Sequence, residues 1–149
     1  MKKRKMLSVG SLALVGSLLF SGVALADFSD WPTLRQGSSG GYVTGLQANL
    51  YSYGQQSAVG TIDGSFGSGT RTGLINMQRA TGLSADGVAG SSTWSEMDDA
   101  SIFDTPYTWT LHTPYSTTYM TSYRESGGRL AYALQYKSDA STVKSGYIY

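Results

Sequence analysis

The chain has 149 residues, of which 11 are lysine or arginine and 10 are aspartate or glutamate, so its formal net charge is +1. It contains one histidine and no cysteine. A zinc hydrolase needs several histidine, cysteine or carboxylate ligands, so this composition argues against zinc chemistry, and we expect no metal or other cofactor. The fold must also close its core without disulfides.

Residues 1–26 have the pattern of a secretory signal peptide. Lys2, Lys3, Arg4 and Lys5 precede an apolar run, and Ala24-Leu25-Ala26 offers a small-x-small cleavage site. The run contains glycine and serine and is followed at once by a polar residue, which favours cleavage after Ala26 over a membrane anchor. Cleavage would leave seven basic and ten acidic residues, a charge of about −3. We therefore expect a secreted protein with no nucleic-acid partner and, after cleavage, no membrane partner.

Two short stretches share the pattern Asp-Gly-x-x-Gly-x-x-Thr, "DGSFGSGT" at 63–70 and "DGVAGSST" at 86–93. A helical stripe with spacing i, i+3, i+4, i+7 precedes each of them. The two stripes are Val43, Leu46, Gln47 and Leu50, and Leu74, Met77, Gln78 and Thr81. The helices are offset by 31 residues and the turns by 23, because "QQSAVGTI" lengthens the first loop. The sequence thus indicates an imperfect internal repeat of helix, loop and tight turn.

Each Asp-Gly pair is typical of a turn, because the carboxylate accepts backbone amide hydrogen bonds and glycine adopts a positive φ. Asp63, Gly64, Asp86 and Gly87 are therefore interpreted as fold determinants. Gln47 and Gln78 each place an amide in a core stripe, and we expect both to hydrogen-bond the neighbouring turn. Serines after each turn, Ser68, Ser91 and Ser92, are expected to cap helices that start near Thr70 and Thr93.

These elements predict three helices around one core. The side chains expected in that core are Val43, Leu46, Leu50, Phe66, Leu74, Met77, Leu83, Val88 and Trp94.

Residues 32–97 resemble the peptidoglycan-binding domain family found on many bacterial cell-wall hydrolases. The resemblance is carried in order by Gly37, Gly40, Leu46-Gln47, both Asp-Gly turns, Gln78, Gly82-Leu83 and Thr93-Trp94. Gly73 stands where the family usually has alanine, and Met77 where it usually has phenylalanine. The resemblance implies a three-helix module that anchors its protein on peptidoglycan and leaves chemistry to a partner domain.

Glycan and stem-peptide ligands need hydrogen-bond donors, a cation for carboxylates and flat apolar faces. Near the expected helix ends, Arg35, Tyr42, Tyr53 and Arg71 offer these groups and are the predicted ligand-binding residues. The alternative for each is an ordinary solvated side chain or a half-buried ring, which is the commoner situation in proteins.

Residues 100–149 differ in composition from residues 27–99, since eight of the eleven tyrosines lie beyond residue 100. Alternating patterns over 107–111, 117–123 and 130–136 predict three strands, "TPYS" and "ESGGR" predict the turns, and "SGYIY" suggests a fourth strand. The expected fold class is α+β, a small three-helix domain at 27–99 followed by a small antiparallel β module at 100–149. A sheet of this size is marginal alone, so its Leu and Tyr face should pack on itself or on the helices. Its other tyrosines either stack on sugar rings or simply fill space.

Catalytic constellations in residues 100–149 are weak. His112 with Asp104 or Asp139 could complete a serine triad on paper, and Asp104, Glu125 and Asp139 are the only acids for a glycosidase pair. The leading hypothesis is therefore a secreted, non-catalytic protein that binds peptidoglycan and is associated with the cell wall. The alternatives are a secreted antimicrobial or toxin-like effector targeted by its wall-binding domain, and an enzyme with an unrecognised active site.

Overall fold

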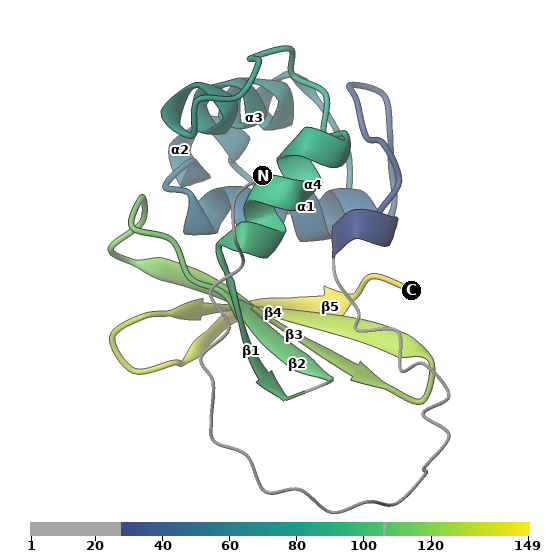
Figure 1. Ribbon diagram of the computed structural model, residues 1–149, viewed down its shortest axis with the longest axis vertical. Helices are drawn as coiled ribbons and strands as arrows, with labels where there is room; N and C mark the ends of the chain where they lie inside the picture. The colour runs from purple at the N-terminus through teal and green to yellow at the C-terminus, as the bar shows by residue number, and fades with distance from the viewer. Residues whose placement is uncertain (1–27, 106) are drawn as a thin grey trace, which may run out of the picture.

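The computed structural model describes residues 28–105 and 107–149 as a layer of helices on one face of a twisted sheet (Figure 1). The expected signal peptide at 1–26 lies outside the described residues. Within the described ranges, no helix combines the length and apolar character needed to cross a membrane.

The helical layer contains the three predicted helices. Its elements are the 3-10 helix η1 (Phe28–Asp30), α1 (Gly41–Ser52), α2 (Gln56–Val59), α3 (Ser68–Ala80) and α4 (Ser91–Asp99). The single turn α2 forms in the stretch expected to be a loop. A Cβ on Gly73 would lie 2.9 Å from the Val59 side chain of α2, so the glycine at this position lets α2 and α3 pack closely.

The expected serine caps are wrong. Helices α3 and α4 start at Ser68 and Ser91, and their N-cap residues are Gly67 and Gly90, without a side-chain capping hydrogen bond. The glycines take extended backbone angles that let the chain turn into each helix, so the serines become the first helical residues.

The sheet has five antiparallel strands in the order β1-β2-β3-β4-β5. They are β1 (Ser101–Thr105), β2 (Thr108–Leu111), β3 (Tyr119–Ser126), β4 (Arg129–Tyr136) and β5 (Thr142–Tyr147). The α+β prediction is confirmed, and β1 is an additional strand. Gly127 and Gly128 form the two-residue β3–β4 turn with φ of 60° and 74°, as a type I′ hairpin requires.

One hydrophobic core joins helices and sheet. Phe28 and Trp31 pack edge-on against Tyr123 of β3, with ring centroids 5.3 and 5.8 Å away, and Trp109 of β2 stacks on the same tyrosine at 5.2 Å. Seven of the nine predicted core side chains are buried. Leu83 and Val88 are only partly buried, because both lie on the loop around the second turn, at the edge of the helical layer.

Polar contacts also tie α1 to β3. The Tyr123 hydroxyl donates to Asn49 Oδ1 at 2.6 Å, and the Thr121 hydroxyl donates to the Ala48 carbonyl at 2.9 Å. Gly45 lets α1 approach the Trp31 ring closely, since a Cβ at this position would lie 2.6 Å from that ring. The Leu and Tyr face of the sheet thus packs on the helices.

The first Asp-Gly turn is held by Gln47, which is 1% exposed. Its amide nitrogen donates to Asp63 Oδ1 (2.9 Å), the Ser65 carbonyl (3.1 Å) and Thr70 Oγ1 (3.0 Å). Its oxygen accepts from the backbone amides of Asp63 (3.0 Å) and Gly64 (2.9 Å). The expected structural role of Gln47 is confirmed.

Gln78 holds the second turn with corresponding atoms. Its nitrogen donates to Asp86 Oδ1 and the Val88 carbonyl, both at 3.0 Å, and to Thr93 Oγ1 at 3.3 Å. Its oxygen accepts from the Gly87 amide at 3.0 Å. Gly64 and Gly87 have φ of 74° and 71°, as the sequence predicts for turn glycines.

We predict that Gln47→Leu lowers the free energy of unfolding by at least about 2 kcal/mol, because it leaves the Asp63 and Gly64 amides without their protein acceptor. Gln56→Leu is the matched control. The Gln56 Oε1 atom is already buried without a partner, so this change should cost less than about 0.5 kcal/mol or stabilise the fold. Urea unfolding measures both, and equal losses would contradict the assignment.

Stability should also depend on acid. The hydrogen bond from Gln47 lowers the pKa of Asp63, and the Val88 amide, followed by Gln78, lowers the pKa of Asp86. A carboxyl whose folded pKa is depressed stabilises the fold above its unfolded pKa of about 3.9, and this contribution is lost as pH falls through the folded pKa. At pH values below about 4, the urea concentration at the unfolding midpoint should therefore decrease. The decrease should be smaller in an Asp63→Asn, Asp86→Asn double variant. If the double variant shows the same pH dependence as the original protein, Asp63 and Asp86 are not the source of the acid sensitivity.

We predict that Tyr123→Phe lowers the free energy of unfolding by about 1–3 kcal/mol, because Asn49 Oδ1 loses a buried donor. Tyr136→Phe is the control, since Tyr136 is 39% exposed.

Helical circular dichroism and tryptophan fluorescence should give one coincident urea transition, because helices and sheet share a core. Two separate transitions would show that the layers fold independently.

Candidate functional site

A hollow of about 390 Å³ opens beside the second Asp-Gly turn. Leu83 and Ser84 line it from the loop after α3, Asp86 from the turn, and Ser91 and Ser92 from the start of α4. The Gln78 network fixes the turn and Thr93 relative to each other, so the hollow has a rigid floor. Its exposed hydroxyls can hydrogen-bond a polar ligand.

The electrostatics of this hollow are mixed. The first turn of α4 points amide groups and the positive end of the helix dipole toward it, and no side chain caps that turn. Asp86 lies in the same wall, and the Val88 amide and Gln78 keep its pKa low. A carboxylate held ionised in this way is a hydrogen-bond acceptor and a poor proton donor. The arrangement therefore suits binding of amides and hydroxyls.

Arg71, a predicted ligand-binding residue near the start of α3, lies next to the second turn. It is exposed on α3, and its Cγ and Nε are 3.0 and 3.1 Å from where a Cβ on Gly87 would stand. The side chain therefore lies over the turn backbone. This position puts a cation over the second turn, outside the lining of the hollow.

Arg35 lies near the first turn instead. Its backbone amide donates to Ser38 Oγ at 3.0 Å, and the Ser38 amide donates to the Arg35 carbonyl at 2.9 Å, which forms a tight exposed loop. Gly37 and Ser38 pair with Phe66, three residues after Asp63. Arg35 and Arg71 thus accompany different turns.

The two predicted tyrosines differ in accessibility. Tyr42 is half-buried, with its ring 5.3 Å from Trp31 and 5.9 Å from Tyr149. Tyr53 is 2% exposed, stacks on Tyr115 at 5.6 Å, and burial raises the pKa of its hydroxyl. We therefore withdraw Tyr53 as a ligand contact, because its ring is enclosed by packing.

The four predicted residues do not converge on one place. Tyr42 and Tyr53 lie 11 positions apart at the two ends of α1, about 16 Å along the axis. The hollow at the second turn is lined by residues that sequence reasoning treated as caps or core, Ser91, Ser92 and Leu83. The signal in the sequence that could have indicated this hollow was the pair of serines after Gly90.

The suggested catalytic groups are dispersed. Asp104 on β1 accepts a hydrogen bond from Thr110 at 3.3 Å, and Asp139 accepts from Ser141 between β4 and β5, at the opposite edge of the sheet. Among the described residues, no hydrogen bond joins His112 to either of them, and no group of three or more His, Cys, Asp or Glu side chains could hold a metal ion.

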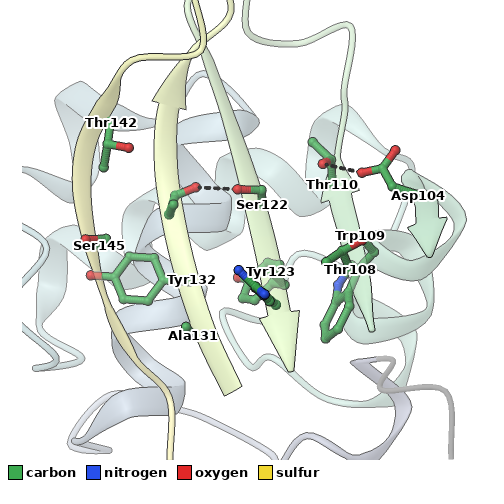
Figure 2. Close-up of a pocket in the computed structure, with 12 residues that line it drawn as sticks. Asp104, Thr108, Trp109, Thr110, Ser122, Tyr123, Ala131, Tyr132, Thr142 and Ser145 are labelled. Atoms are coloured by element: carbon green, nitrogen blue, oxygen red, sulfur yellow. Dashed lines mark hydrogen bonds between the residues drawn. The ribbon is translucent and has the colours of Figure 1, made fainter. Parts of the chain in front are cut away.

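A second hollow, of about 460 Å³, lies on the face of the sheet that points away from the helices. Figure 2 shows its polar side chains, among them Ser122, Thr110 and Asp104.

Known proteins share the helical part of the chain. A zinc D-Ala-D-Ala carboxypeptidase of Streptomyces albus G is 42% identical over 65 residues, which are 44% of this chain and 26% of that protein. A spore cortex-lytic enzyme of Oceanobacillus iheyensis is 41% identical over 80 residues, 54% of this chain and 28% of the relative. A probable N-acetylmuramoyl-L-alanine amidase of Bacillus licheniformis is 35% identical over 80 residues, which are 52% of this chain and 23% of that protein.

The chain thus spans about a quarter of the length of these curated relatives. Residues 39–97, or 59 of the 149 residues, match the family described as the putative peptidoglycan binding domain. This range contains α1 to α3, both Asp-Gly turns and all of α4 except its last two residues, and it ends before the sheet. The helical layer therefore matches the peptidoglycan binding domain family, which its motifs resemble.

Proposed function

We propose that this protein is secreted, binds peptidoglycan through its helical layer and has no catalytic activity of its own. The observation that carries the proposal is the family match over residues 39–97, whose two turns are each held by an intact glutamine network. Association with the cell wall follows from this binding. Secretion rests on the signal pattern of residues 1–26, and the active form would then begin at Asp27.

The hollow at the second turn is the proposed contact site. Its serines and α4 amides would hydrogen-bond the amide and hydroxyl groups of glycan and stem peptide, and Arg71 would pair with a stem-peptide carboxylate. Arg35 and Tyr42 lie on exposed or half-exposed surface elsewhere on the helical layer and are proposed as secondary contacts.

The proposal of a binding protein contrasts with the names of the relatives, which are enzymes. Those proteins are about four times as long as the matched segment. In the described part of this chain, Asp86 is held ionised and His112 makes no hydrogen bond to the acids proposed to accompany it. Neither arrangement supplies the paired acid and base that bond cleavage needs.

We expect residues 27–149 to pellet with insoluble peptidoglycan and to leave the turbidity of the suspension unchanged. Arg71→Ala should weaken binding at least about fivefold, because the stem-peptide carboxylate loses its cation. Arg79→Ala is the matched control, an exposed arginine at the other end of the same helix.

A protein that stays in the supernatant while a known wall binder pellets would refute the binding function. Loss of turbidity would refute its non-catalytic character. If both arginine variants bind equally well, the contact site does not lie at the second turn.

A further inference from the structure

The outer face of the sheet is defined by the alternation of β3. Thr121 and Tyr123 contact α1, so Ser122 and Arg124 point to the opposite side. None of the described helices covers that side (Figure 1). The helical layer and the outer face are therefore two separate surfaces of one rigid fold.

The register of the sheet aligns short side chains across the middle of the outer face. Thr110, Ser122, Ala133 and Ser145 are direct neighbours on β2, β3, β4 and β5. Three strand spacings separate the first from the last, about 14 Å. These short side chains form the floor of the 460 Å³ hollow.

Polar and charged groups surround this floor. Asp104 and the hydroxyl of Thr110 are joined at 3.3 Å on one side, as Figure 2 shows. Arg124 lines the hollow, and its side chain takes part in no hydrogen bond or ion pair with the described residues. Its guanidinium is thus a free donor of a charge-assisted hydrogen bond.

An aromatic ring lies on β5, at the opposite edge of the outer face from Asp104. Tyr147 stands opposite Ala131 on the outer face and is 57% exposed. The Arg129 guanidinium lies 3.7 Å above its ring and adds a second cation near Arg124. Hydroxyls, a flat ring and cations therefore occur together on the outer face, with the ring and Arg129 outside the lining of the hollow.

This combination selects among classes of ligand. Protein interfaces are depleted in serine and alanine at their centre, which is where the outer face has them. A nucleic acid needs a larger basic surface than two arginines beside an aspartate. A volume of about 460 Å³ is within the usual range of small-molecule sites. Many hydroxyls with an aromatic ring suit a sugar, and the free arginine suits a carboxylate.

We propose that the outer face is a second binding site, specific for a saccharide that carries a carboxylate. The proposal rests on the proposed function, because peptidoglycan strands carry a free N-acetylmuramic acid carboxylate wherever the stem peptide has been removed. The site would let one chain hold the wall by two surfaces, on the helical layer and on the outer face, and so raise its avidity.

The test is an NMR titration of residues 27–149 with two soluble probes. The acidic probe is the disaccharide N-acetylglucosaminyl-N-acetylmuramic acid, and the neutral probe is tri-N-acetylglucosamine. With the acidic probe, the largest amide shifts should fall on Thr110, Ser122 and Ala133. Arg124→Gln should weaken the acidic disaccharide at least fivefold and the neutral sugar less than twofold.

Ser122→Phe fills the floor and should abolish the outer-face shifts that the probes cause. Ser138→Phe, the same change at an exposed position between β4 and β5, should leave these shifts intact. Unchanged urea midpoints show that each variant is folded. Undiminished outer-face shifts in a folded Ser122→Phe variant would overturn the proposal.

Three further results would also overturn it. Shifts confined to the second-turn hollow, shifts that depend on protein concentration without probe, or no shifts in a chain that still pellets with peptidoglycan would each reject the outer-face site. The last result would leave the proposed function standing. Conversely, the outer-face shifts could occur while Arg71→Ala leaves pelleting with peptidoglycan unchanged. That result would reject only the contact site on the helical layer.

Discussion

The hydrogen bonds from two buried glutamines to two Asp-Gly turns are the constraint on which the helical layer depends. Gln47 and Gln78 each use both ends of the side-chain amide, so each turn is held relative to the helix before it and the threonine after it. Buried amides left unpaired are costly, which makes these contacts decisive for the fold. The hollow beside α4 exists because the second turn is fixed in this way.

The sheet and the helices stabilise each other. β3 supplies Tyr123 to the aromatic core and Thr121 to the backbone of α1, while α1 covers the face of a sheet that would be marginal alone. This mutual packing leaves the opposite face free to carry polar residues. Binding groups can therefore occupy two surfaces, the helical layer and the outer face, without disturbing the core.

The sequence predicted most of the fold because the local patterns agree with the tertiary structure. Helical stripes, Asp-Gly turns and strand alternation each reappear, and the expected partners of Gln47 and Gln78 are confirmed. The serine caps were wrong because extended glycines precede both helices, a feature of backbone angles that side-chain preference does not reveal.

The candidate site was less predictable. Periodicity placed Tyr53 at a helix end but could not show that Tyr115, 62 residues later, would enclose it. The hollow beside α4 and the hollow on the outer face arise from packing and strand register, which involve residues far apart in the chain. The binding role of Arg71 stays a prediction from its place near a helix end, whereas its position over Gly87 is a property of the folded chain.

Hydrogen exchange of residues 27–149, with and without insoluble peptidoglycan, tests most directly whether the helical layer binds the wall. We predict that peptidoglycan protects the amides of residues 84–93, around the second turn and the start of α4. Unchanged exchange throughout the helical layer, under conditions where the protein is pelleted, would contradict it.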